Sequence, residues 1–451
     1  MTGALLKLTT LNFKLPPGLT HLVTNLFFMK IFTLILAVCL VVLLVISCKH
    51  NPGMPEKTAA DILGNPAYQA ISFGAYREIT RDIQPTIPQL KEDLKILSAM
   101  GIRLLRTYNV YLDEAANLLE AIRQLKQEDP AFEMYLMLGA WIDCKNAWTE
   151  LPPDHDQESE KNAGEIDRAV ALAKKYPDIV KIIAVGNEAM VKWAAAYYVQ
   201  PGVILKWVEH LQDLKKKGEL PKTLWITSSD NFASWGGGGE EYHVEDLTKL
   251  IKAVDYISMH TYPMHDTHYN PDFWGVRENE ASLSDLEKID AAMLRARNYA
   301  MAQYESVVKY MKSLGVDKPV HIGETGWATA SNELYGEEGS RATDEYKSAL
   351  YYKSMREWTN KAGISCFYFE AFNEPWKDAA NPGGSENHFG LFNIQAQAKY
   401  AIWDLVDAGT FEGLTRDGQP ITKTFNGDRE ALMKTVKVPP ADAELQARKQ
   451  Q

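Results

Sequence analysis

Cysteine is scarce in this sequence. Four cysteines occur among 451 residues, and no two of them have the CxxC spacing of a metal or redox site. Cys39 and Cys48 lie in an apolar N-terminal segment. Cys144 and Cys366 each flank an apolar, strand-like run, so we expect isolated core thiols rather than a disulfide.

Basic residues are also in short supply. Lys and Arg total 48 against 59 Asp and Glu, which leaves a formal net charge of −11. This balance argues against a nucleic-acid partner and against binding to an anionic membrane surface. A phosphate-binding loop is missing too, because the glycine run at 236–239 is followed by neither Lys nor Ser nor a helix start.

Metal ligands at a recognised spacing are absent as well. His260, His265 and His268 cluster, but their spacing matches no common zinc motif, and histidine also serves as a hydrogen-bond donor in sugar-binding sites. We therefore expect neither a metal nor another cofactor. The 46% of hydrophobic residues is ordinary for a folded chain with a large core. Among them are 11 Trp and 21 Tyr, whose flat rings suit stacking on sugars, although most are expected in the core.

One long apolar run is present, from Ile31 to Ser47, with Lys30 before it and Cys48 after it. A basic start, an apolar stretch, small residues and then cysteine are typical of a bacterial lipoprotein signal peptide. We predict a signal over 1–47, lipidation of Cys48, a linker over 48–65 and a location in the cell envelope. Met29 offers another start, so residues 1–28 can be a mis-assigned extension. An uncleaved transmembrane anchor is the alternative, because 17 residues nearly span a bilayer.

From about residue 66 the chain alternates short apolar runs with longer amphipathic ones. The expected strands are Ile71–Tyr76, Ile102–Thr107, Phe132–Ala140, Ile179–Val185, Thr223–Ser228, Val254–His260, Pro319–Gly323 and Ser365–Glu370. The expected helices are Pro88–Met100, Ala115–Gln127, Glu160–Lys175, Val203–Lys217, Glu245–Lys252, Ile289–Ser313, Arg341–Lys361 and Gln395–Ala408. Gly101, Gly315 and Gly363 fit helix C-terminal caps.

Continuous apolar strands indicate a parallel sheet covered on both faces. Eight β/α units predict a single (β/α)8 TIM barrel over 66–410 with enlarged βα loops, followed by a C-terminal extension over 411–451. An open doubly wound sheet is the alternative, but no Gly-rich loop follows its first strand. The extension is polar after Leu414, and we expect disorder from Glu444 to Gln451.

Chemistry in such barrels takes place at the C-terminal ends of the strands. The residues at these ends are polar and aromatic: Tyr76, Arg77, Arg106, Tyr108, Asn109, Trp141, Asp143, Asn187, Glu188, Ser229, Asp230, Asn231, His260, Tyr262, Glu324, Trp327, Glu370, Asn373, Glu374 and Trp376. They predict where the cleft lies.

Two glutamates stand out, because each follows an apolar run directly. Hydrolysis of a glycosidic bond needs one carboxylic acid that donates a proton and one carboxylate that attacks or activates water. Glu188 follows Asn187, whose amide can hold a sugar 2-hydroxyl, and it suits the acid/base; a helix N-terminal charge is the structural alternative. Glu324 lies between glycines and precedes Trp327, a possible floor for a sugar. A carboxyl separation of about 5–5.5 Å would make Glu324 the nucleophile of a retaining enzyme.

Glu370 and Glu374 end the eighth predicted strand. They either bind sugar hydroxyls or support the site through Lys377 or Arg106. The segment 264–313 is long and carries Tyr269, Phe273 and Trp274, and an aromatic wall there would favour chain ends or short oligosaccharides.

The sequence resembles glycoside hydrolase family 17, the β-1,3-glucanases and glucanosyltransferases of clan A. The resemblance rests on Gly186–Glu188, Gly323–Trp327, Phe369–Lys377 and Glu386–Phe392, and it covers roughly 70–408. It implies a retaining barrel enzyme with Glu188 as acid/base and Glu324 as nucleophile. It further implies that the glucose subsites are lined by Tyr108, Tyr262, Glu370, Glu374 and Lys377.

The chain departs from the family pattern at two places. Ala328 and Thr329 stand where members often have Pro-Ser, and Asn373 replaces an Asp of some members. Neither change removes a catalytic group. The expected function is hydrolysis of β-1,3-glucan by a monomer, with substrate contacts from Tyr76, Arg106, Asn187, Asp230, His260, Trp327 and Trp376 as well. Transglycosylation, another β-glucan linkage and a lipid-anchored glycan-binding protein remain alternatives.

Overall fold

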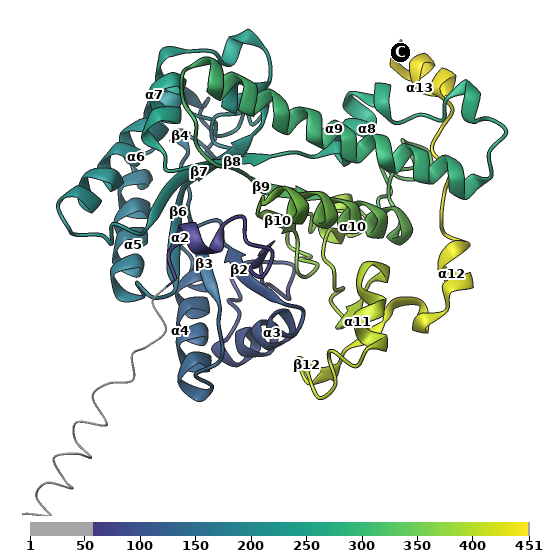
Figure 1. Cartoon of the computed structure of the whole chain (residues 1–451), viewed down its shortest axis with the longest axis horizontal. Helices are drawn as coiled ribbons and strands as arrows, with labels where there is room; N and C mark the ends of the chain where they lie inside the picture. The colour runs from purple at the N-terminus through teal and green to yellow at the C-terminus, as the bar shows by residue number, and fades with distance from the viewer. Residues whose placement is uncertain (1–56, 450–451) are drawn as a thin grey trace, which may run out of the picture. The chain divides into compact units, whose positions relative to one another are not determined.

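A closed barrel of eight parallel strands lies at the centre of the computed structural model, which describes residues 57–449 (Figure 1). Around the barrel the strands follow the order β1, β10, β9, β8, β7, β6, β3 and β2, so that chain neighbours lie side by side. Their bounds are β1 Gln69–Ser72, β2 Ile102–Arg106, β3 Tyr135–Ala140, β6 Val180–Asn187, β7 Trp225–Asn231, β8 Ile257–His260, β9 Val320–Gly326 and β10 Cys366–Phe369. The predicted (β/α)8 barrel is confirmed.

Amphipathic helices cover the barrel from outside, as their hydrophobic periodicity predicts. They are α3 Ile87–Ala99, α4 Asp113–Glu128, α5 Lys161–Lys175, α6 Pro201–Lys216, α7 Glu245–Ala253, α9 Asp285–Ser313 and α10 Glu345–Ala362. Gly363 ends α10 in the left-handed conformation, and Gly101 and Gly315 after α3 and α9 also have positive φ. The predicted glycine caps are therefore confirmed.

The last predicted helix, over residues 395–408, is wrong. The segment instead forms the short strand β11 (Gln397–Ala398), a 3₁₀ turn and the short helix α11 (Trp403–Asp407). Tertiary contacts override the helical pattern here, because β11 pairs with β14 (Thr422–Lys423). In addition, buried Lys399 donates to Asn373 Oδ1 at 2.9 Å, which holds the segment against the barrel.

The bottom of the barrel is closed by residues that we had assigned to a linker. Thr58 caps the short helix α2 (Ala59–Ile62), whose Ala59 and Ile62 are fully buried. These side chains pack against barrel residues that include Leu104 and Phe367. The folded unit thus begins near residue 57, and residues 58–65 are part of it because their apolar side chains fill the barrel's lower end.

Three further excursions leave the strand–helix alternation. A hairpin of β4 (Cys144–Lys145) and β5 (Asp154–Glu158) lies between β3 and α5. A second excursion lies between β8 and α9 and contains α8 (Pro263–Tyr269). The C-terminal extension contains β12 Thr415–Arg416, β13 Gln419–Pro420, β14, α12 Arg429–Met433 and α13 Asp442–Lys449.

The expected disorder at the C-terminus is wrong for residues 444–449, which belong to α13. Figure 1 shows α13 beside the connection that contains α8. Leu445 is buried, and Asp442 pairs with Arg277 of that connection at 3.0 Å. A helix of polar composition is ordered here because it docks on the β8–α9 connection.

Within residues 57–449, Cys144 and Cys366 are buried free thiols, as expected. No helix of this part of the chain has both the length and the hydrophobicity needed to span a bilayer. The predicted signal peptide, the Cys48 lipid site and the alternative transmembrane anchor lie outside the described residues.

Candidate active site

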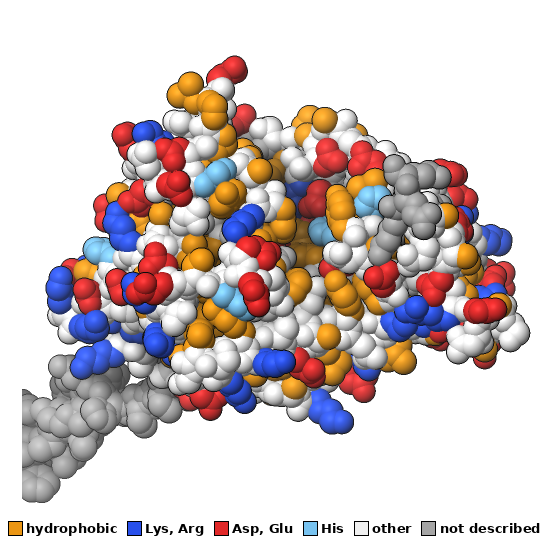
Figure 2. Space-filling model, turned by 90° about the horizontal axis from the view of Figure 1, so that it is seen from above, with side chains coloured by type: hydrophobic (Ala, Val, Ile, Leu, Met, Phe, Trp, Pro, Cys, Tyr) orange, Lys and Arg blue, Asp and Glu red, His pale blue; other side chains and the backbone are white. Residues whose placement is uncertain are grey.

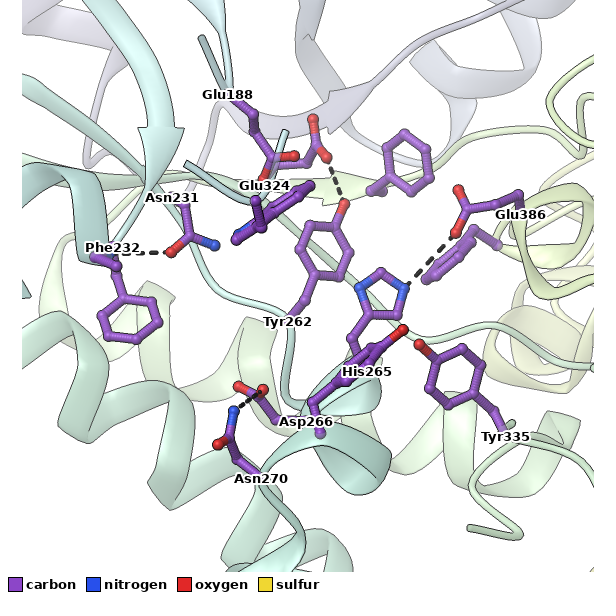
Figure 3. Close-up of a pocket in the computed structure, with 15 residues that line it drawn as sticks. Glu188, Asn231, Phe232, Tyr262, His265, Asp266, Asn270, Glu324, Tyr335 and Glu386 are labelled. Atoms are coloured by element: carbon purple, nitrogen blue, oxygen red, sulfur yellow. Dashed lines mark hydrogen bonds and ion pairs between the residues drawn. The ribbon is translucent and has the colours of Figure 1, made fainter. Parts of the chain in front are cut away.

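Strands β6 and β9 deliver the two predicted glutamates to one end of the barrel. Glu188 follows β6, and its amide donates to the carbonyl of Ser229 on β7 at 3.0 Å. Glu324 lies within β9 and is in register with His260 of β8. Both carboxyl groups line one cavity of about 850 Å³, and Figure 3 shows them side by side. The structure thus brings together two residues 136 positions apart in the sequence.

The backbone at Glu188 is held in an unusual conformation. Glu188 has a φ of 47°, in the left-handed region, two residues after Gly186 at 79°. A non-glycine residue there costs on the order of 1–2 kcal/mol, so surrounding contacts must hold it. No described helix begins at Glu188, since α6 starts at Pro201. The alternative role as a helix N-terminal charge is therefore wrong.

Glu324 is surrounded by donors. Arg106 donates to its Oε2 at 2.6 Å, Tyr108 to the same oxygen at 2.9 Å and Tyr262 to Oε1 at 2.6 Å. Burial acts to raise the pKa of this carboxyl. The positive charge of Arg106 and the two tyrosine hydrogen bonds act against burial, and the pKa of Glu324 lies below its ordinary value. Glu324 is therefore ionised at neutral pH.

Glu188 has the opposite electrostatic environment. Burial, followed by the negative charge of Glu324, raises the pKa of Glu188 to about 8. Its described side-chain hydrogen-bond partner is Nδ1 of His260 at 3.1 Å. Burial lowers the pKa of His260 to about 4, so the imidazole is neutral and does not stabilise a carboxylate as a cation would. Glu188 accordingly keeps its proton at neutral pH.

Three predicted substrate-binding residues lie beneath the site and line neither cavity of the cleft. Arg106 is buried and donates to the Asn187 side chain as well as to Glu324. Fully buried His260 lies between Glu188 and Ser229, whose hydroxyl is 2.7 Å from Nε2. Asp230 is also fully buried and accepts from the Met190 amide at 2.8 Å. These side chains position the loops and carboxyl groups, because a buried polar group has to be paired internally.

The predicted sugar floor at Trp327 is wrong. Its side chain is 0% exposed, and its indole N–H donates to the Ala342 carbonyl at 2.9 Å. The indole packs against Trp274 and Tyr351 in the core. The strand places this side chain between β9 and the helices rather than above the barrel mouth.

The glycines that flank Glu324 also have a structural role that we had not predicted. A Cβ on Gly323 would lie 2.1 Å from the Ser258 hydroxyl, and one on Gly326 would lie 2.2 Å from the Phe369 carbonyl. They are needed for close packing inside the barrel, rather than for close approach of a substrate.

A second cavity of about 1020 Å³ continues from the first. The two cavities share Glu324 and Phe369, so together they form a cleft across the barrel mouth. Figure 2 shows a hollow in the molecular surface. Six predicted binding residues line the second cavity: Tyr76, Tyr108, Asn187, Glu374, Trp376 and Lys377. Tyr262 lines the first.

Glu370 and Glu374 separate in role. Glu374 lines the cleft and lies 3.2 Å from the Lys377 ammonium group. Glu370 is buried behind it, 3.6 Å from the same group, and does not line the cleft. Burial raises the pKa of Glu370 well above its ordinary value, so this side chain is neutral and supports Lys377 without facing the substrate.

The sequence reasoning missed several residues of the cleft. His265 and Glu386 form a pair at 3.7 Å and line the first cavity, where Figure 3 shows His265 beside Tyr262. Buried Glu114 lines the second cavity and accepts from the Ala75 amide at 2.9 Å. Glu386 belongs to a motif that we had singled out without assigning a role. Glu114 opens a helix, so its sequence signal was that of a capping charge.

Of the aromatic wall expected from segment 264–313, the structure places only Tyr269 on the cleft. Phe273 and Trp274 are buried, and the Trp274 indole donates to the Ser340 carbonyl at 2.7 Å. Tyr269 is exposed and lines the first cavity. Two of the three aromatic residues therefore belong to the core, and the expected bias toward chain ends stays a prediction.

Comparison with family models matches residues 70–390 to the BtgE/BtgC glycoside hydrolase domain. The chain belongs to this family. A crystal structure of an endo-laminarinase from Formosa Hel1_33_131 is 69% identical, with a TM-score of 0.85 over 86% of this chain and 98% of that one.

Two curated relatives of this glycoside hydrolase are fungal. A probable glucan endo-1,3-beta-glucosidase btgC of Aspergillus terreus is 22% identical over 339 residues, which are 73% of this chain and 43% of the relative. A glucan 1,3-beta-glucosidase of Arthroderma benhamiae is 36% identical over 241 residues, which are 51% of this chain and 64% of the relative. The chain therefore spans less than half the length of the Aspergillus relative that it matches.

Proposed function

We propose that this glycoside hydrolase cleaves β-1,3-glucan of the laminarin type by double displacement with retention. One observation carries the proposal: two glutamates of one cleft differ in protonation state. Glu188 is neutral because its pKa is raised, and Glu324 is ionised because its pKa is lowered. A pair of carboxyl groups with separated pKa values is the arrangement that a glycosidase needs, and the resemblance to family 17 supports retention.

The reaction follows from these protonation states. In the first step Glu324 attacks the anomeric carbon while Glu188 gives its proton to the departing glycosidic oxygen. The C–O bond breaks, a glucosyl ester forms on Glu324, and Glu188 is left as a carboxylate. In the second step Glu188 takes a proton from water, the water oxygen attacks the anomeric carbon, and the ester bond to Glu324 breaks. Both glutamates return to their initial states.

The two cavities supply the two sides of the cleaved bond. Glu188 lines the first cavity and not the second, so the leaving group occupies the first. Asn187 lines the second, which therefore holds the glucosyl unit that becomes attached to Glu324. Arg106 donates to Oδ1 of Asn187, which leaves the amide NH₂ for the sugar 2-hydroxyl. Room on both sides of the catalytic pair supports cleavage within a chain.

The substrate class is supported by the named relatives. Two relatives are described as a probable glucan endo-1,3-beta-glucosidase and a glucan 1,3-beta-glucosidase, so their substrate is a β-1,3-glucan. The Formosa structure is described as an endo-laminarinase, and laminarin is a β-1,3-glucan. The Formosa enzyme is covered nearly whole, so its cleft loops have counterparts in this chain.

The decisive experiment follows laminarin hydrolysis by proton NMR, with a protein that starts at Lys57 and with Glu324→Gln as control. Early release of the β-anomer by the intact protein, and none by Glu324→Gln, is expected. Early α-anomer would refute retention. Products longer than the substrate would assign the protein to transfer rather than hydrolysis. Saturable binding without products, unchanged in the variant, would assign it to glycan capture.

We further propose that the mature protein is a monomer held at the cell envelope by a lipid on Cys48. The basic, apolar and cysteine-terminated segment before residue 49 supports the anchor. Metabolic labelling with a fatty acid should mark the wild type and not Cys48→Ser. Label retained by Cys48→Ser would refute the lipid anchor. A dimer mass in light scattering of the protein that starts at Lys57 would refute the monomer.

A further inference from the structure

Trp148 presents an indole ring at the rim of the second cavity. It belongs to the segment between β4 and β5, and its side chain is 63% exposed. The same cavity reaches Asn187 and Glu324 at its base. None of the sequence motifs includes Trp148, and the reaction described above does not use it. A large exposed aromatic residue in a sugar cleft needs an explanation.

The ring of Trp148 is held in place from below. It stacks on Tyr197 with centroids 5.2 Å apart and an interplanar angle of 22°. Tyr197 in turn contacts Trp141 at 5.2 Å, so three rings form one cluster. Tyr197 is largely buried, and burial followed by the charge of Glu188 raises its pKa. The cluster therefore extends from the catalytic region to the rim.

A buried carboxylate anchors the same cluster. Burial raises the pKa of Asp143, while hydrogen bonds from Ser159, Trp141 and Trp148 act to lower it. The Asp143 carboxyl thus interacts with both indoles. With one face of Trp148 on Tyr197, the other face is the part left for a ligand.

The backbone at this place is also constrained. Trp148 has a φ of 61° and Asn146 one of 65°, both in the left-handed region. A bulky residue there is a true outlier, and the Asn146 side chain holds the turn by donating to the Pro152 carbonyl at 3.0 Å. The strained backbone thus occurs at Trp148, whose ring lines the cleft, as is common for strained residues at functional sites.

We propose that Trp148 forms a remote glucosyl subsite on the side of the cleft that holds the non-reducing part of the glucan chain. The proposal rests on the proposed function and names a specificity residue for it. A glucosyl ring stacks its C–H face on the exposed indole face, and the neighbouring cleft residues supply hydrogen bonds to its hydroxyls. Tyr111, exposed on the β2–α4 connection, lines the same cavity.

The test compares kcat/KM of the wild type and Trp148→Ala on laminaritriose, laminarihexaose and laminarin. Loss of one stacked ring should lower kcat/KM by about tenfold on laminarihexaose and laminarin. The proposed subsite lies beyond the units that laminaritriose fills, so kcat/KM on this substrate should stay within about twofold of the wild type. Trp148→Tyr, which keeps a ring, should restore most of the activity on the long substrates.

Leu151→Ala is the matched control, because Leu151 is exposed in the same segment but does not line the cavity. It should behave as the wild type on every substrate. Trp148→Gln is the second variant in case Trp148→Ala does not fold, because its longer side chain still covers Tyr197 but has no ring. It should show the same loss of kcat/KM on long substrates alone. An equal effect on short and long substrates, or no effect, would overturn the subsite. Absence of hydrolysis by the wild type would overturn the proposed function instead.

Discussion

Nδ1 of His260 lies 3.1 Å from Oε1 of Glu188, and its Nε2 lies 2.7 Å from the Ser229 hydroxyl. The imidazole is buried and neutral, so it orients the proton donor without supplying a charge that would ionise it. Glu324, on the neighbouring strand, is the residue that receives the positive charge of Arg106. The barrel thus separates the pKa values of two glutamates, because Glu324 is paired with a cation and Glu188 with a neutral ring.

The pH dependence of catalysis should follow this separation. In the proposed reaction Glu188 acts in its protonated form, which is lost as the pH rises through about 8. Glu324 acts in its ionised form, which is lost only as the pH falls through a pKa below the ordinary value of a carboxyl. We expect kcat/KM on laminarin to be bell-shaped, with a basic limb near pH 8 and an acid limb below that of a free glutamic acid.

Glu188→Gln identifies the basic limb. Without a proton donor, kcat/KM on laminarin should fall by about 10²–10⁴-fold and lose its basic limb. An aryl β-1,3-glucobioside with a nitrophenol leaving group needs no protonation, so its first step should be nearly unaffected. A basic limb that persists in Glu188→Gln would assign it to another group.

Removal of the imidazole should disturb Glu188 without preventing substrate binding. His260→Leu deletes the contact to Oε1, and we expect kcat on laminarin to fall by about 10–100-fold because the acid is misplaced. KM should change little, since His260 does not line the cleft. His260→Gln keeps a polar group near Glu188 and should restore part of kcat. A large rise in KM with unchanged kcat would show that His260 contacts the substrate.

The tyrosine hydroxyls should set the acid limb. Tyr108 and Tyr262 donate to opposite oxygens of Glu324 and stabilise its ionised form. In Tyr108→Phe or Tyr262→Phe the pKa of Glu324 rises, so the acid limb of the kcat/KM profile should move to higher pH. Activity is then lost at low pH first, while the basic limb stays in place. Tyr346→Phe serves as control, because Tyr346 lines neither cavity, and it should leave both limbs unchanged.

The sequence was sufficient to predict the barrel and the meeting of Glu188 and Glu324 in one cavity, because both follow from local patterns. Continuous apolar runs separated by amphipathic segments define the strands and helices. Glu188 and Glu324 stand directly at strand ends, and parallel strands of one barrel bring such ends together. The same rule placed Asn187, Tyr108, Tyr262 and Glu374 on the cleft, whereas Lys377 was expected there from the family resemblance.

The rule failed where the direction of a side chain mattered. Trp327 and Arg106 also stand at strand ends, yet Trp327 points into the core and Arg106 beneath the site. A one-residue step along a strand reverses the face, and a single sequence does not specify it near a bulge. His265, Glu386 and Trp148 come from long connections whose paths depend on tertiary contacts. The sequence around them carries no periodic signal.

The C-terminal extension should stabilise the barrel through Arg416. Its guanidinium group donates to Asp93 Oδ1 at 3.0 Å, and both side chains are fully buried. Arg77 of the β1–α3 connection pairs with the same carboxylate at 3.0 Å. Arg416→Met leaves Asp93 with one cation, so the free energy of unfolding in urea should fall by about 2–4 kcal/mol, near the cost of breaking a buried pair.

Arg429 provides the matched control for this substitution, because it lies on the same extension and is exposed. Arg429→Met should unfold at the wild-type urea concentration. Below its unfolding transition, Arg416→Met should retain the wild-type kcat on laminarin, since Arg416 does not line the cleft. Equal unfolding midpoints for Arg416→Met and Arg429→Met would show that the extension does not hold the barrel through this pair. A loss of kcat in the folded Arg416→Met variant would instead show that the extension shapes the cleft through Arg77 and the β1–α3 connection.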